Sequence, residues 1–125
     1  MNNFGSKLLS LVPLLLLAAV VGAAVPKPLD PLRVAPHIFS LEFENERVRV
    51  LKQIVRNGEN QPLHAHPDRL LVYLQTCGWL EDDGKGNRHM EEFKFGQVVW
   101  ADAVTHGGEN ADVVQQCQIL EIELL

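Results

Sequence analysis

The stretch PLHAHPDRLLVYL, from Pro62 to Leu74, decides the fold. It holds His64 and His66, and side chains two positions apart in a strand project from the same face. Two imidazoles on one strand can present nitrogens to a single metal ion if other strands supply further ligands. The sequence therefore predicts a metal-binding strand, in a fold that brings at least one distant ligand to it.

Short strand patterns lie on both sides of this stretch. Apolar and polar residues alternate in 37–44, 47–55 and 117–125, which predicts strands. Turn signals separate the strands, such as NGEN, in which Gly58 is free to adopt a positive φ. About eight or nine short strands, with no long amphipathic helix, predict a single all-β domain of the sandwich or barrel class.

The N-terminal segment differs in composition from the rest of the chain. Residues 1–24 begin with a polar stretch containing Lys7 and continue as an apolar run that ends in small residues. This pattern predicts a signal peptide over residues 1–24 and export to the periplasm or the cell exterior. An uncleaved leader is the alternative, and it is the one route by which we expect the chain to contact a membrane.

Proline dominates the next segment. Residues 25–36 read VPKPLDPLRVAP and contain four prolines. Because proline fixes φ and has no amide hydrogen, we expect residues 25–37 to form an extended connector and not a helix. The barrel domain then comprises residues 38–125.

Charge excludes one class of partner. The 125-residue chain carries a formal charge of -5 at pH 7, and loss of Lys7 with the leader makes the mature chain more negative. An acidic surface without a basic cluster repels phosphate backbones. We therefore expect no nucleic-acid partner.

The chain contains two cysteines, Cys77 and Cys117. In an exported protein they can form a disulfide that persists. Two separate, half-buried thiols are the alternative, because the sequence does not give the distance between them.

A third histidine, His106, follows His66 by 40 positions in another turn-rich β segment, and a barrel can bring such distant strands together. One known motif has its residues in register at Gly58, His64, His66 and Gly78. A second motif begins at Gly96 and ends with His106 and Asn110, but His106 comes one residue early, and Asp102 and Val104 stand where proline and glycine are usual. With them the chain resembles the cupin superfamily over residues 38–124. The resemblance implies a cupin-type jelly-roll barrel of two antiparallel sheets.

One ligand of the cupin pattern is missing. The first motif usually contains a glutamate, and Leu70 and Leu71 occupy its place. The chain therefore resembles those cupins that hold iron or another divalent ion through histidines alone. This implies His64, His66 and His106 as ligands of Fe, Mn, Zn or Ni, whereas a retained fold with a degenerate metal site is the alternative.

Four further residues are candidates for lining a pocket. Tyr73 and Trp100 have aromatic side chains that suit a pocket, although an aromatic residue in a strand also suits a core or an interface. Glu109 is an acidic residue near His106, and Asn110 ends the second motif.

The resemblance implies two classes of function. The first is an exported small cupin whose three histidines hold a divalent ion that acts, as in oxygenases, on a small chelating substrate. The alternative is a non-catalytic module that binds a small molecule or serves a structural role. Under either reading we expect a homodimer, because the resemblance implies pairing through sheet faces and several strands carry apolar groups on both faces.

Overall fold

The structure is a computed structural model that describes residues 27–82, 85–107, 109–110, 113 and 115–125. The expected signal peptide, residues 1–24, lies outside the described residues. Within the described ranges, no helix has the length and hydropathy needed to cross a membrane.

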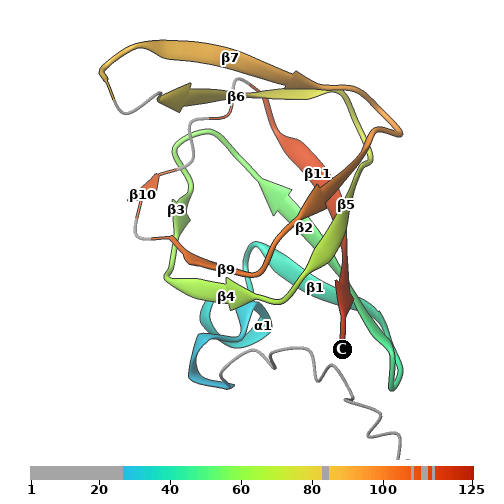
Figure 1. Cartoon of the computed structure of the whole chain (residues 1–125). Coiled ribbons are helices and arrows are strands. Elements are labelled where there is room, and N and C mark those ends of the chain that lie inside the picture. Colours follow the sequence, from blue (N-terminus) through green and yellow to red (C-terminus); the bar gives the residue numbers. More distant parts are fainter. Residues whose placement is uncertain (1–26, 83–84, 108, 111–112, 114) are drawn as a thin grey trace, which may run out of the picture.

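Strands make up most of the described chain (Figure 1). They are β1 (Phe39–Glu44), β2 (Val48–Val55), β3 (Asn60–Gln61), β4 (His64–His66), β5 (Arg69–Tyr73), β6 (Cys77–Asp82), β7 (Arg88–Phe93), β8 (Val98–Ala101), β9 (Val104–His106), β10 (Glu109–Asn110) and β11 (Cys117–Leu124). The predicted all-β class is confirmed.

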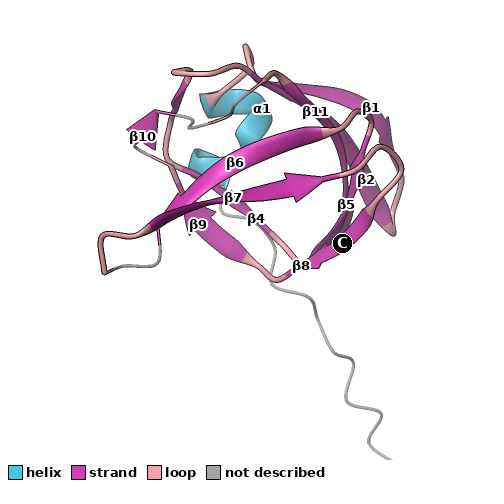
Figure 2. Cartoon of the chain, turned by 90° about the horizontal axis from the view of Figure 1, so that it is seen from above, coloured by secondary structure: helices cyan, strands magenta, loops and turns pink. Residues whose placement is uncertain are grey.

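The strands form one large antiparallel sheet and three antiparallel pairs. The large sheet has the order β1-β2-β11-β5-β8, and the pairs are β3 with β10, β4 with β9, and β6 with β7. Figure 2 shows the large sheet curving along one side, with the β4–β9 and β6–β7 pairs lying across from it. Side chains that point inward from these walls meet in the interior of a barrel.

The expectation of an extended connector is wrong for its described part. A 3-10 helix, η1 (Lys27–Leu29), precedes a single helical turn, α1 (Pro31–Val34). Pro31 occupies the first helical turn, where no amide hydrogen is needed, and the Asp30 carboxylate accepts a hydrogen bond from the Leu32 amide at 2.9 Å. The prolines therefore start a helical turn that packs against β1 and β4.

The inner face of the large sheet changes character along its strands. Its buried residues on β2 and β11 are Arg49, Leu51, Gln53, Val55, Cys117, Ile119, Glu121 and Glu123. The register places Glu123 beside Arg49 and, six residues along β11, Cys117 beside Val55. The interior is therefore charged at one end of the barrel and apolar at the other.

One row of residues on the outer face of the same sheet is apolar across the full width of the sheet. This cross-strand row consists of Phe43, Val50, Ile122, Leu70 and Trp100, and it takes one residue from each of the five strands. The residues at the two ends of the row, Phe43 and Trp100, are each 52% exposed. A sheet face turned to water is usually polar, so this row is a candidate interface.

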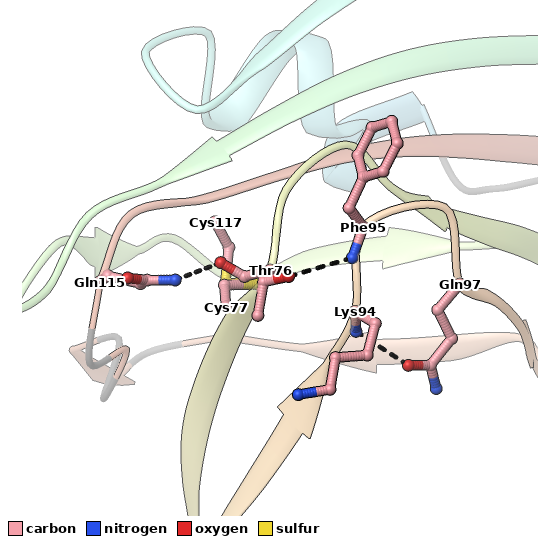
Figure 3. The surroundings of a disulfide bond; sticks show 7 residues. All are labelled: Thr76, Cys77, Lys94, Phe95, Gln97, Gln115 and Cys117. Carbon is pink, nitrogen blue, oxygen red and sulfur yellow. Dashed lines mark hydrogen bonds between the residues drawn. A yellow bond between two sulfur atoms is a disulfide. The ribbon is translucent and has the colours of Figure 1, made fainter.

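A disulfide closes the apolar end of the interior. Cys77 on β6 and Cys117 on β11 are bonded, with their Cα atoms 5.4 Å apart, and both are buried. The bond joins the large sheet to the β6–β7 hairpin. Beside it, the Thr76 carbonyl accepts a hydrogen bond from the Gln115 side chain, and the Thr76 hydroxyl accepts one from the Phe95 amide (Figure 3).

We predict that the disulfide supplies a large part of the folding free energy. The two cysteines are 40 positions apart, and a loop of that length corresponds to about 4 kcal/mol in the chain-entropy treatment of cross-links. Urea unfolding of the Cys77→Ala, Cys117→Ala double variant should show a loss of about that size. A loss below about 1 kcal/mol would contradict the prediction.

Candidate metal centre

The three candidate histidines come from two short strands that pair with each other. β4 carries His64 and His66, and β9 ends with His106. In the antiparallel register His64 lies directly opposite His106, while His66 lies opposite Val104. The pairing of two segments about 40 residues apart therefore brings the three imidazoles to one place.

The imidazole nitrogens converge on a common point. One ligand nitrogen from each of His64, His66 and His106 lies within 4.8 Å of the others. His64 is 0% exposed and His66 is 3% exposed. The Nε2 atoms of all three rings are buried and have no hydrogen-bond partner among the described residues. Because buried polar atoms are nearly always paired, three converging unpaired nitrogens fit a bound metal ion.

His64 is oriented by the backbone just before β4. Its Nδ1 donates to the Pro62 carbonyl oxygen at 2.6 Å, so Nε2 is the nitrogen left to bind a ligand. Gly107, directly after His106, packs against the same carbonyl: a Cβ at that position would lie 2.5 Å from Pro62 O. Gly107 also has a φ of 121°, which favours glycine. A small residue here lets β9 approach β4 closely enough for the histidines to meet.

His66 is oriented by a carboxylate from the large sheet. Its Nδ1 donates to Glu123 Oε1 at 2.7 Å. The other carboxylate oxygen, Oε2, accepts hydrogen bonds from the Arg49 guanidinium at 2.6 Å, and that guanidinium also pairs with Asp30 at 2.6 Å. A carboxylate behind a ligating histidine fixes the tautomer and makes the imidazole a stronger base.

A second buried ion pair lies next to the first. Arg69 Nε donates to Glu121 Oε2 at 2.7 Å, and Arg69 Nη1 donates to the Asp102 carbonyl at 3.2 Å. The same Glu121 oxygen is 3.4 Å from Nδ1 of His66. The carboxylates of Glu121 and Glu123 therefore place negative charge beside Nδ1 of His66. They do not lie among the three converging Nε2 atoms, where the glutamate of the motif would be a ligand.

Burial favours the neutral form of two of the imidazoles, those of His64 and His106. Burial lowers the pKa of His64, and it lowers the pKa of His106 to about 4, with the positive charge of protonated His64 adding to the effect. The Phe39 ring packs against the rings of His64 and His66, with centroid distances of 5.1 Å and 5.5 Å. Neutral, firmly packed imidazoles have free lone pairs at pH 7, as metal ligation requires.

A pocket of about 360 Å³ adjoins the histidines. It is lined by Gln53, Gln61, Arg69, Leu71, Tyr73, Trp79, Phe93, His106, Ile119 and Glu121. Half of these side chains are polar or charged and half are apolar or aromatic. Because His106 belongs to the lining, a molecule in the pocket can reach an ion held by the histidines.

The remaining candidates from the sequence lie in different places. Tyr73 lines the pocket, whereas Trp100 lies on the outer face of the large sheet, where its Nε1 donates to Asp102 Oδ1 at 2.8 Å. The expectation that Trp100 lines a pocket therefore does not hold for this one, because the side chains of β8 alternate and position 100 points outward. Glu109 and Asn110 form β10, and their side chains lie outside the described part of the structure.

The two leucines in place of the motif glutamate point in opposite directions. Leu71 lines the pocket, and Leu70 belongs to the outer row of the large sheet. An aliphatic residue therefore faces the pocket at this position.

Sequence reasoning missed the buried polar residues behind the histidines. These are Arg49, Gln53, Gln61, Arg69, Glu121 and Glu123. Strand 117–125 alternates apolar and polar residues, so either set can face inward, and the alternation alone does not choose. Glu121 and Glu123 could have been predicted from the chemistry of metal sites. A histidine that binds a metal through one nitrogen needs a hydrogen-bond acceptor for the other, and two glutamates at alternate positions of one strand can supply such acceptors.

Comparisons with known proteins find similar structures but no related sequence family. No family model and no curated protein matches the chain. A cupin domain from Bordetella pertussis Tohama I is 21% identical, with a TM-score of 0.48, over 70% of this chain and 92% of that one. A cupin superfamily protein from Desulfitobacterium hafniense DCB-2 is 16% identical, with a TM-score of 0.46, over 70% and 76%.

An RmlC-like cupin protein from Desulfovibrio desulfuricans covers more of the chain. It is 18% identical, with a TM-score of 0.44, over 91% of this chain and 97% of that one. The chain is thus similar to solved structures of the superfamily that its motifs resemble.

We predict that Glu123 strengthens metal binding without touching the ion. In Glu123→Gln the side chain keeps its shape but loses the charge that supports His66, so affinity should fall about 10–100-fold. Competition with a chromophoric chelator measures the change, and circular dichroism checks that the fold survives the weakened Arg49 pair.

Glu44→Gln is the matched control, because Glu44 is exposed on β1. An affinity of Glu123→Gln within about twofold of the unaltered protein would contradict a supporting role for this carboxylate.

Proposed function

We propose that this chain is an exported, cupin-type jelly-roll metalloprotein in which His64, His66 and His106 hold one divalent transition-metal ion. The observation that carries the proposal is the convergence of three buried, unpaired Nε2 atoms. Export is supported by the disulfide, since such bonds persist in oxidising compartments. The mass of the protein recovered outside the cytoplasm tests export, because cleavage removes about 24 residues.

The ion is proposed to act on a small chelating substrate. A divalent ion on three neutral imidazoles keeps open coordination positions and supplies a Lewis acid that polarises a bound oxygen atom. The protein's own side chains hold the ligands in place and line the pocket. The donor set is compatible with Fe, Mn, Zn or Ni, and oxygenase-like chemistry is the reaction class that we propose.

A non-catalytic module is the second candidate, and one observation favours it. Glu121 is the only carboxylate among the described residues of the pocket lining, and Arg69 already pairs with it. A general base must be free to take a proton from the substrate. A protein without such a base can still bind a small molecule through its metal or its pocket.

The first test is metal content. Protein purified without a polyhistidine tag should hold about one divalent ion per chain, whereas His66→Ala should hold almost none, because a lost ligand weakens binding more than the roughly 10–100-fold effect of a lost supporting group. Elemental analysis by plasma mass spectrometry measures both. His89→Ala is the control, since His89 is exposed on β7.

Two results would count against this function. Unaltered protein that takes up no stoichiometric Fe, Mn, Zn or Ni would contradict the metal centre. A small molecule that co-purifies without metal, and that the triple histidine-to-alanine variant retains, would favour the non-catalytic module.

We also propose a homodimer formed through the outer face of the large sheet. Five strands about 4.8 Å apart and up to about eight residues long present a face of roughly 600 Å² per subunit. A pair of such faces buries about 1,200 Å², the lower end of the range for stable interfaces. Support comes from the row of Phe43, Val50, Ile122, Leu70 and Trp100, which crosses the whole face.

The dimer is tested by placing a charge at the centre of this row. Ile122→Glu should weaken association by on the order of a hundredfold or more, because the carboxylate would be desolvated without a partner. Light scattering coupled to size exclusion measures the molar mass. Met90→Glu is the control, because Met90 is 47% exposed on the β6–β7 hairpin. A monomeric unaltered protein, or a dimer that Ile122→Glu leaves intact, would exclude this interface.

A further inference from the structure

The pocket beside the histidines is polar and apolar in successive layers. Across β11 and β5, the register pairs Glu123 with Arg69, then Glu121 with Leu71, then Ile119 with Tyr73. Inward-facing residues of one strand are two positions apart, which corresponds to about 7 Å between layers. A molecule about 7 Å long therefore contacts charged residues at one end and apolar residues at the other.

The apolar part of the pocket has an aromatic wall. Tyr73 and Phe93 stack with their ring centroids 4.3 Å apart and their planes 1° from parallel, and Trp79 on β6 lines the same pocket. These three rings come from β5, β7 and β6. Trp79 and Phe93 are only partly buried, so part of their surface is open to a ligand. An aromatic wall of this kind favours a planar ring as the bound group.

The polar part has hydrogen-bonding capacity that the protein does not use. Gln53 is 6% exposed and Gln61 is 8% exposed, and both line the pocket. Among the described residues, no hydrogen bond joins either side-chain amide to another residue. Because both side chains line the pocket, their amides are available to hydrogen-bond a polar atom of a bound molecule.

The charges around the centre limit the charge of the ligand. Two guanidinium groups, of Arg49 and Arg69, face three carboxylates, of Asp30, Glu121 and Glu123. The group carries a formal charge of −1 while the imidazoles are neutral, and a divalent ion changes this to +1. A ligand with a single negative charge then gives an electrically neutral site, which is the least costly state for a buried cluster.

We propose that the pocket selects a planar aromatic chelator with one anionic oxygen, whose donor atoms reach the ion beside His106 and whose ring lies against Trp79 and Phe93. This inference rests on the proposed metal centre. It adds the class of ligand, which the three histidines alone do not specify. The pocket volume of about 360 Å³ accommodates one such ring with its chelating group.

Two hydroxamates with the same chelating group test the proposal. Benzohydroxamate carries a phenyl ring where acetohydroxamate carries a methyl group, and both bind as singly charged, two-oxygen chelators. Co(II)-loaded protein is titrated with each, and the visible absorption of the cobalt gives the dissociation constants. The ring should make benzohydroxamate bind at least about tenfold more tightly, because its surface is buried against apolar side chains.

Variants locate the ring. Trp79→Ala and Phe93→Ala should each lower the affinity for benzohydroxamate much more than the affinity for acetohydroxamate, and so remove most of this preference. The absorption spectrum of the cobalt without added ligand checks that fold and metal centre are intact. Phe95→Ala is the control, because Phe95 is 74% exposed and lies outside the pocket lining. It should preserve the preference.

The outcomes separate the two proposals. Cobalt that binds normally, with equal affinity for the two hydroxamates, overturns the ligand class but not the metal centre. A ring preference that survives both Trp79→Ala and Phe93→Ala also overturns it, because the ring then lies elsewhere. Protein that takes up no cobalt overturns the metal centre and the ligand class together.

Discussion

The buried contact between His66 and Glu123 is the interaction on which the rest of the structure depends. It links the β4–β9 pair, which carries the histidines, to the centre of the large sheet. Through Arg49 the same carboxylate is joined to Asp30, so even the helical turn before the first strand belongs to this network. Removing one member would leave a buried charge unpaired, which is far more costly than losing a surface ion pair. The network therefore fixes the large sheet, the β4–β9 pair and the helical turn relative to the candidate metal ligands.

This network accounts for the division of the barrel into two ends. Charged groups behind the histidines need one another as partners, so they gather at the end where Arg49 and Glu123 pair. The opposite end has no such requirement and holds the apolar core with the disulfide. The candidate metal ligands with their charged partners and the apolar core thus occupy different parts of one small interior, and the pocket lies across their boundary.

Sequence reasoning predicted the class of the fold and the three histidines, but not what surrounds them. The spacing of His64 and His66 fixes their common face, and the turn at Gly58 has the expected positive φ of 75°. Alternation in β2 and β11 does not reveal which face is inside, because charged residues such as Arg49 and Glu123 are buried there through ion pairs and hydrogen bonds with residues distant in the sequence. The composition of the proline-rich segment likewise did not predict the helical turn that Asp30 caps. These features depend on contacts between residues far apart in the sequence.

The position of β11 between β2 and β5 has a consequence for the order of folding. β2 and β5 cannot be joined until β11 enters between them, and β11 follows β5 by more than 40 residues. Such distant pairing is slow to form, because the entropy of closing long loops is lost before the contacts are gained. Since β11 also carries Glu121 and Glu123, a partly folded chain has histidines without their supporting carboxylates. An ion held by these histidines would therefore reach its final coordination only after β11 has been inserted and the barrel is nearly complete.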